Sequence, residues 1–366
     1  MSQSTSRVSE LIVCLALFEV GSTTLFMMGA EAKQDAWLAM LLGSSIGLLL
    51  LLLHLAIHQL DPRLDLFRLF RRYMGKYLGT LMNLLFIGYF TYETSRNLRD
   101  LAEVTVMTLL NKTSLWIILL AAIMVISNNV RHGPEVFFLI CVVLLPVIVV
   151  SYMIIGIFIP ATGLLHFEFM FPILENGWSP VIQAAVPEIV SFPFGQTVVF
   201  LVFYPLALKG RGLSRAVIIS YVLTALLLTA FNQLNILVLG PTLAANSTLP
   251  LLETVQLIQV AEVLERMDAL FILVLFLGVG IKMTTFFNGA VIGLERITGI
   301  SAKKWILPVG AIIFALSFLA PNYTRHIEVG RNVVVNYWWP VFQGALPLLL
   351  LVVMIISKRK KKSVPA

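Results

Sequence analysis

The sequence predicts an all-α polytopic membrane protein with ten transmembrane helices, which form a single domain over residues 1–366. Hydrophobic residues make up 59% of the chain and charged residues only 12%, whereas about a quarter of a typical soluble domain is charged. A helix needs ~20 largely apolar residues to cross a bilayer. Runs that approach this length lie near residues 9–29, 37–58, 78–110, 114–128, 134–159, 187–208, 213–239, 268–292, 304–320 and 337–357.

Lysine and arginine are unevenly distributed over the loops between these runs. With the N-terminus placed inside, 18 of them fall on the inner side, including the basic tail 358–366, and 5 fall on the outer side. Cytoplasmic loops carry the basic excess in membrane proteins. We therefore expect both termini to be cytoplasmic, and we interpret the net charge of +7 as a topology signal rather than a nucleic-acid surface.

Two stretches between the runs are amphipathic rather than spanning. Residues 62–76, PRLDLFRLFRRYMGK, alternate apolar side chains with arginines at helical spacing. Residues 250–262, PLLETVQLIQVAE, show the same pattern with acidic residues on the outer side. Such a pattern is typical of a helix that lies in the interface of a lipid bilayer, and plain connecting loops are the alternative.

Interruptions inside two apolar runs predict an inverted repeat. The first run contains FEVGSTTLF, Phe18 to Phe26, and the sixth contains PEIVSFPFGQ, Pro187 to Gln196. Because each half contains five spans, an odd number, the first repeat (about 9–159) and the second repeat (about 187–357) have opposite orientations. Transporters built from inverted repeats place the binding site near the midplane, where interrupted helices occupy matching positions of the two halves.

The residues from Gly21 to Thr24 explain why a helix could break at this depth. Glycine is unfavourable in a helix by about 1 kcal/mol relative to alanine, and serine and threonine offer the backbone other hydrogen bonds. A break exposes amide donors, which suit a carboxylate, and carbonyls, which suit an ammonium group. A zwitterionic amino acid has both groups. The alternative is a close helix-packing surface of small residues.

Ionisable residues within the spans are expected to have partners or a cavity, because a charge at the bilayer centre costs roughly 2.5–3.5 kcal/mol. The deep candidates are Glu19, Glu93, Glu188 and Lys282. We expect Lys282 to pair with Glu93 or with Glu19. This pair either polarises the ligand site or acts as a static structural ion pair.

Patterns for catalysis or metal binding are weak in this sequence. His54 and His58 share a helix face, but two imidazoles without a nearby cysteine or acid do not make a metal site. We find no Walker motif, no dinucleotide-binding fingerprint and no nucleophile and base constellation. We expect no enzyme activity, no metal and no cofactor.

Several stretches together resemble one family. They are AKQDAWLAMLLGS at 32–44, MGKYLG at 74–79, LAEV at 101–104 and VLERMDALF at 263–271. They are similar to the B subunits of spore germinant receptors, which form the spore permease family within the amino acid, polyamine and organocation transporter superfamily. The resemblance implies a ten-helix, LeuT-like 5+5 inverted repeat with interrupted helices 1 and 6. It also implies the inner membrane of a bacterial spore, a small-molecule germinant that is often an amino acid, and a complex with an A subunit and a lipoprotein C subunit.

The resemblance also implies which residues bind the ligand. Mapped onto this chain, they are Gly21, Ser22 and Thr23 at the first break, Phe192, Phe194, Gly195 and Gln196 at the sixth, and Tyr89, Glu93, Lys282 and Thr285 facing the pocket. The chain departs from the family pattern at two places. It has Met27 and Met28 where a proline commonly follows the first break, and Gln196 where a glutamate is common.

These observations predict a membrane subunit that recognises a small nutrient at the two breaks and triggers germination through partner subunits. An ion-coupled amino acid permease is the main alternative. A partner-dependent ion or water conduit, and a scaffold without a ligand, are further alternatives.

Overall fold

The computed structural model describes residues 8–207, 212–258 and 267–362 of the chain, and every regular element within them is helical. The α-helices are α1 (Val8–Val20), α2 (Ala36–Leu60), α3 (Leu66–Met74), α4 (Lys76–Thr108), α5 (Leu115–Arg131), α6 (Pro134–Ala161), α7 (Trp178–Ala184), α8 (Leu213–Leu239), α9 (Pro241–Asn246), α10 (Pro250–Gln256), α11 (Met267–Thr298), α12 (Ala302–Leu316), α13 (Tyr323–Val329) and α14 (Leu346–Lys362). The 3₁₀ and π segments are η1 (Thr23–Leu25), η2 (Ala30–Asp35), η3 (Phe167–Met170), η4 (Ala185–Ile189), η5 (Phe194–Val202), η6 (Tyr204–Ala207), η7 (Gly330–Trp338) and η8 (Pro340–Ala345).

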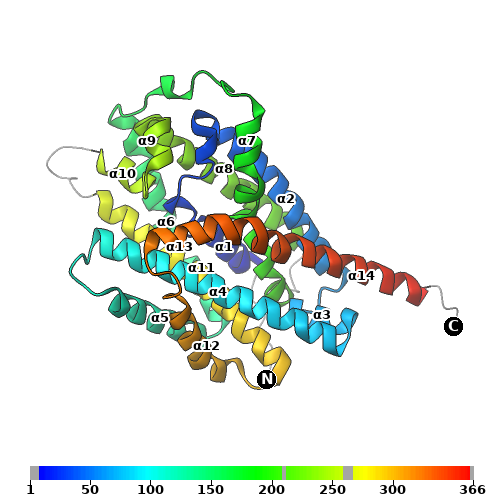
Figure 1. The fold of residues 1–366 in the computed structure, drawn as a ribbon. Coiled ribbons are helices and arrows are strands. Elements are labelled where there is room, and N and C mark those ends of the chain that lie inside the picture. Colours follow the sequence, from blue (N-terminus) through cyan, green and yellow to red (C-terminus); the bar gives the residue numbers. More distant parts are fainter. Residues whose placement is uncertain (1–7, 208–211, 259–266, 363–366) are drawn as a thin grey trace.

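Helices α1 and α11 form the centre of the bundle. In the apolar windows of these helices 61% and 72% of the residues are buried, against 33% in α6. Helix α11 packs along α4, and α1 contacts α6, α8 and α11. Figure 1 shows α1 in the middle of the bundle, behind α4 and the stretch from α13 to α14. Glu19 of α1 and Lys282 of α11 are thus shielded by the other helices, and both are fully buried.

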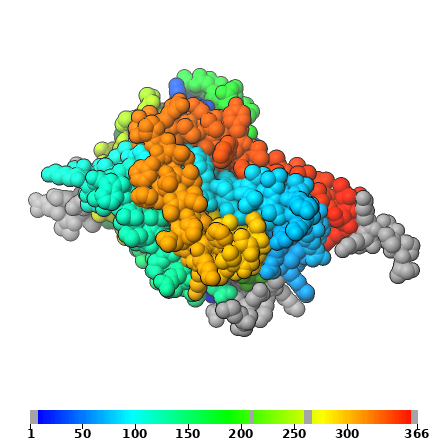
Figure 2. Space-filling view, turned by 60° about the horizontal axis from the view of Figure 1, so that its bottom comes forward, coloured from blue at the N-terminus to red at the C-terminus, as the bar shows by residue number. Residues whose placement is uncertain are grey.

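The outer helices present apolar side chains. On α6, Leu139, Val143 and Met153 are exposed. The last helical stretch is only 22% buried in its apolar window, and its α14 part extends beyond the body of the bundle (Figure 1, Figure 2). Apolar surface of this extent is typical of a protein that has lipid as its solvent.

The amphipathic stretch 62–76 contains α3. Its apolar residues, Phe67 and Phe70 among them, are buried on the side that packs against α4. Asp65 accepts a hydrogen bond from the amide of Arg68 at 2.9 Å and forms an ion pair with Arg296 at 2.8 Å. A side-chain acceptor at this position satisfies an amide of the first turn. Hence α3 begins at Leu66, and the ion pair joins its start to the C-terminal end of α11.

Among the described residues, seven helical stretches are long and apolar enough to cross a membrane. They are Val8–Leu25, Ala30–Leu60, Pro134–Ala161, Trp178–Val202, Leu213–Leu239, Met267–Thr298 and Tyr323–Arg359. The chain is therefore a multi-pass membrane protein. The other three predicted spans correspond to α4, which carries several charges, and to α5 and α12, which have 17 and 15 residues.

Two predicted span boundaries were wrong. The sixth predicted span, 187–208, corresponds to the stretch Trp178–Val202, which begins nine residues earlier than predicted. Residue 208 lies outside the described residues. The last stretch begins at Tyr323 rather than at 337. Hydropathy misses its first turns because they are charged, yet Arg325 and Glu328 pair within the helix at 2.6 Å. Of the predicted segment 250–262, α10 covers Pro250–Gln256, and residues 259–262 lie outside the described residues.

Candidate functional site

The first interruption follows the end of α1 at Val20. The amide of Gly21 still donates to the carbonyl of Leu17 at 3.0 Å, and the hydroxyl of Thr23 donates to the carbonyl of Glu19 at 2.5 Å. Only the three-residue η1 follows, and Phe26 is then extended. The helix therefore ends where the glycine, serine and threonine pattern predicts, although the expected second half-helix is reduced to a single 3₁₀ turn.

Asn232 of α8 holds the extended segment after this turn. Its side-chain oxygen accepts from the amide of Met28 at 3.0 Å, and its side-chain nitrogen donates to the carbonyl of Met28 at 2.9 Å. Both residues are buried. Non-helical backbone inside a membrane protein needs such partners, because lipid offers none.

The second interruption lies between α7 and η5. Val186 has extended backbone angles within η4, and a turn at Phe192 and Pro193 separates the helix from the 3₁₀ segment η5. Pro187 and Pro193 have no amide hydrogen and cannot continue a helical ladder. The predicted break from Phe192 to Gln196 therefore coincides with this turn and the first residues of η5.

A cavity of about 450 Å³ lies between the two interruptions, the C-terminal half of α4, and α13. Four of the expected site residues line it, namely Ser22, Glu93, Phe192 and Gln196. Charged residues on its wall are Arg96, Asp100, Glu188 and Arg331. The cavity thus contains both signs of charge and brings together both breaks and span three.

Glu93 is the most strongly held acidic group of the cavity. The side-chain nitrogen of Gln196 donates to Glu93 Oε2 at 2.8 Å, and the indole nitrogen of Trp339 donates to Oε1 at 2.5 Å. The Trp339 ring also stacks on Phe192, with the ring centroids 5.7 Å apart. Glu93, Gln196 and Trp339 therefore form one unit that joins three helical stretches at the cavity wall.

A second layer of polar contacts lies beside this unit. It is one helical turn before Glu93 on α4 and one turn after Trp339 in the stretch Tyr323–Arg359. The amide of Gln343 donates to the hydroxyl of Tyr89 at 3.0 Å, and Tyr89 stacks on Phe342 with centroids 4.7 Å apart. His54 Nε2 lies 2.9 Å from the carbonyl of Gln343. A Cβ on Gly195 would collide with the Gln343 side chain. Tyr89 and Gly195 thus lie in a filled region, outside the residues that line the cavity.

Sequence reasoning missed Trp339, which lines the cavity, and Gln343, which lies behind the cavity wall. They are four residues apart, so they occupy one face of the last stretch and reach Glu93 and Tyr89, which are also four apart. The available signal was Gln343 itself, which is the one polar side chain between Pro340 and Ile356.

Lys282 is buried and forms no ion pair with the described residues, which corrects the predicted pairing with Glu93 or Glu19. Its Nζ atom lies over aromatic rings, 4.2 Å from the centroid of Phe192 and 5.3 Å from that of Phe18. Within the described part of the chain, neither this ammonium group nor the Glu19 carboxylate has a hydrogen-bond partner. The ring faces replace the expected carboxylate, because a cation is attracted to an aromatic face.

The remaining predicted site residues lie in packed regions, outside the lining of this cavity. Gly21 packs against α11, where an added Cβ would lie 3.2 Å from the carbonyl of Gly278. The ring of Phe194 lies 5.2 Å from that of Tyr221. Thr285 donates to the carbonyl of Ile281 at 2.8 Å. Thr23 borders a smaller space of about 10 Å³.

Comparisons with known proteins identify the family and the fold of this chain. The chain is 32% identical to spore germination protein KB of Bacillus subtilis (strain 168), over 99% of this chain and 98% of that protein. It is 23% identical to spore germination protein YndE of the same organism, over 99% of each chain.

Its fold is similar to that of Mhp1, a nucleobase-cation-symport-1 family transporter, solved in a closed conformation with bromovinylhydantoin bound. The TM-score is 0.66, with 12% identity over 96% of this chain and 80% of the transporter. The family model described as "Spore germination protein" matches residues 6–325, and the chain belongs to this spore permease family.

Proposed function

We propose that this protein is the ligand-binding membrane subunit of a spore germinant receptor. It recognises a small nutrient, such as an amino acid, at the interrupted parts of helices 1 and 6, and it triggers germination through an A subunit and a lipoprotein C subunit. The observation that carries the proposal is the Glu93, Gln196 and Trp339 unit at the wall of a cavity bounded by both interruptions. A ligand in contact with this unit touches three helical stretches at once.

The cavity supports a small polar ligand. Its volume of about 450 Å³ falls in the ~300–1,000 Å³ range of small-molecule sites. Glu93 and Glu188 offer acceptors for an ammonium group, and Arg96 and Arg331 offer donors for a carboxylate. Tyr89 and Lys282 then act behind the cavity wall, where they position the residues that touch the ligand, whereas Thr285 belongs to the packing of α11 against α1.

We also propose that the chain has ten spans arranged as two inverted repeats, about 9–159 and 187–357, with both termini cytoplasmic in the inner membrane of the spore. Helices α4, α5 and α12 supply the three spans beyond the seven apolar stretches. The charges of α4 are compatible with this role because Arg99 forms an ion pair with Glu103 at 2.6 Å and donates to the carbonyl of Ser317 at 3.0 Å. Pairing lowers the cost of a charge at membrane depth.

An ion-coupled amino acid permease is the second candidate function. The similarity of the fold to a cation-coupled transporter favours it. Uptake by purified protein in liposomes distinguishes the two functions. A permease takes up labelled amino acid when an ion gradient is imposed across the liposome membrane, and a receptor subunit alone does not.

A thermal-shift screen of nutrients against the purified chain tests the ligand site. A ligand that binds only the folded state raises the melting temperature, and we expect at least one amino acid or sugar to do so. Gln196→Met removes the donor to Glu93, and we expect it to weaken binding of that nutrient at least tenfold.

Gln233→Met is the matched control for this screen. Gln233 is buried in α8 outside the cavity lining, and its amide group has no hydrogen-bond partner among the described residues. We expect this variant to bind the nutrient as the unmodified chain does. A screen without any stabilising nutrient, or equal binding by the Gln196 and Gln233 variants, contradicts the proposal.

A further inference from the structure

Two apolar grooves flank α5, and only one of them carries positive charge. The first groove, of about 550 Å³, lies between α5 and α12. The second, of about 380 Å³, lies between α5, α6 and α11. Helices α5 and α12 contact each other on the face of the molecule that Figure 2 presents.

Arg131 and Lys303 mark one end of the first groove. Arg131 is the last residue of α5, Lys303 lies in the first turn of α12, and both side chains are exposed. The described residues that line this groove include no aspartate or glutamate. The second groove is lined by apolar residues with Thr105, Asn129 and Thr284, and its described lining contains no charged side chain.

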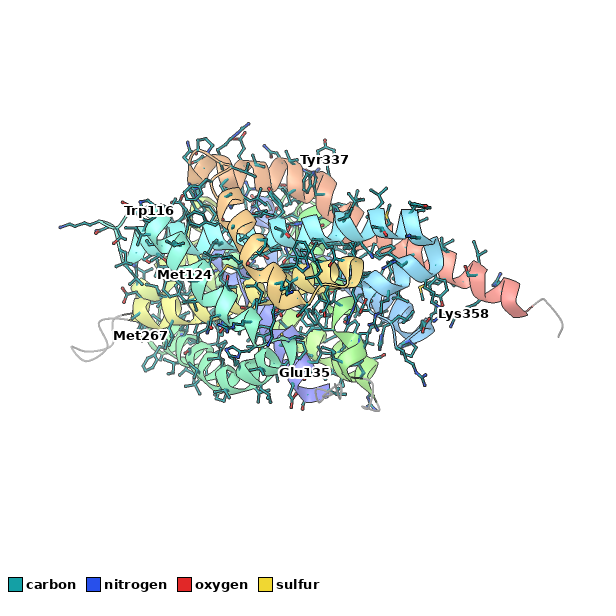
Figure 3. All side chains as sticks on the ribbon, turned by 90° about the horizontal axis from the view of Figure 1, so that it is seen from below. Trp116, Met124, Glu135, Met267, Tyr337 and Lys358 are labelled. Carbon is teal, nitrogen blue, oxygen red and sulfur yellow. The ribbon has the colours of Figure 1, made fainter. Side chains whose placement is uncertain are left out.

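The first groove is long, apolar and open. Its lining extends over twelve residues of each helix, from Leu120 to Arg131 and from Lys303 to Phe314, which is about 17 Å at the helical rise. Met124, labelled on α5 in Figure 3, is 58% exposed and lines the groove. At the base of the groove, Gly310 allows α12 to pack closely on α5, because an added Cβ would lie 3.3 Å from Ser127 Oγ.

We propose that this groove binds an anionic phospholipid. The phosphate group contacts Arg131 and Lys303, and one acyl chain lies along the apolar part toward Phe314. Basic pockets between transmembrane helices recognise anionic headgroups in this way. Charge complementarity decides the class of lipid, since a groove whose described lining holds two cations and no carboxylate favours a headgroup with net negative charge over a zwitterionic one.

Native mass spectrometry of the full-length protein, released from nanodiscs that contain phosphatidylglycerol and phosphatidylcholine, tests the headgroup contact. We expect the protein to retain phosphatidylglycerol preferentially. The double variant Arg131→Gln, Lys303→Gln should weaken this retention about thirty-fold, which is the factor expected for two interfacial cations. The control, Arg63→Gln, Lys76→Gln, removes two other exposed cations and should retain the lipid.

A second pair of variants tests the acyl-chain contact without changing charge. Ala311 lines the first groove and Ala121 lines the second, and both are exposed. Ala311→Trp should fill the first groove and abolish preferential retention, whereas Ala121→Trp should leave it unchanged. Equal loss in both double charge variants, or full retention in Ala311→Trp, overturns the proposal. If the groove holds a partner helix instead of a lipid, the protein should still retain phosphatidylglycerol in Ala311→Trp, and this result overturns the proposal.

Discussion

The two interruptions of the bundle are built from different residues and held in different ways. The first, after α1, depends on glycine: Gly21 lies against the backbone of Gly278 on α11. The second, before η5, depends on proline, and its neighbouring Gln196 donates to Glu93. The first interruption is thus held by close backbone packing and by hydrogen bonds from Asn232 to the main chain, and the second by a hydrogen bond between two side chains.

This difference bears on how a break in an apolar run is interpreted. Small residues at such a break predict either a ligand site or a close packing surface. At the first interruption both interpretations apply to neighbouring residues, because Gly21 packs on α11 whereas Ser22 lines the cavity. A bulky replacement of Gly21 therefore cannot separate ligand binding from folding, and the variants below act on one interruption at a time.

The largest effect is expected from Gly278→Ala. The added Cβ would lie 2.9 Å from the carbonyl oxygen and 3.0 Å from the Cα of Gly21, and neither backbone atom can move without shifting α1. Overpacking costs about 1–3 kcal/mol, and we expect the upper end, about 3 kcal/mol. Denaturant unfolding in detergent measures the change in the free energy of unfolding.

Gly280→Ala is the matched control on the same helix. Its added Cβ meets only the side chain of Ile126, at 3.8 Å. Alanine is favoured over glycine in a helix by up to about 1 kcal/mol, so this variant should be as stable as the unmodified chain or slightly more stable. Equal destabilisation by both variants contradicts the packing role of the first interruption.

An intermediate effect is expected from Asn232→Leu. The substitution removes both hydrogen bonds to Met28 and leaves its buried amide and carbonyl without partners. An unsatisfied buried polar group costs about 1–3 kcal/mol, and we expect a loss of about 2 kcal/mol in the free energy of unfolding. The neighbouring Gln233→Leu removes an amide without partners among the described residues and should be neutral. If the two leucine variants unfold alike, Asn232 does not hold the first interruption.

Much of the helical architecture could be predicted from hydropathy, and the exceptions have physical causes. The predicted span 213–239 coincides with α8, which is apolar and uninterrupted. The start of the last stretch was missed because its charged residues are paired in space, Arg325 lying 2.6 Å from Glu328. A hydropathy profile sums residue properties along the chain and contains no information about such partners.

The site was harder to predict because side-chain direction is set by tertiary packing. Glu93 and Gln196, which the resemblance implies as ligand residues, both line the cavity. Lys282 was paired with a carboxylate on the basis of charge alone, and its actual neighbours are the rings of Phe18 and Phe192. Aromatic faces are not visible as partners in a sequence, because aromatic residues occur throughout the core.

The smallest effect is expected from Thr285→Val, which tests whether the lining of the cavity defines the site. Thr285 is buried one turn from Lys282, its hydroxyl donates within α11, and it faces Cys14 of α1, with 3.8 Å between Oγ1 and Sγ. It belongs to the packed surface of the first interruption. The melting temperature should change by at most a few degrees, and the nutrient affinity that Gln196→Met weakens should stay within twofold of the unmodified chain. A tenfold loss of affinity in Thr285→Val means that the ligand reaches past Ser22 to α11, so that the two interruptions form one continuous site.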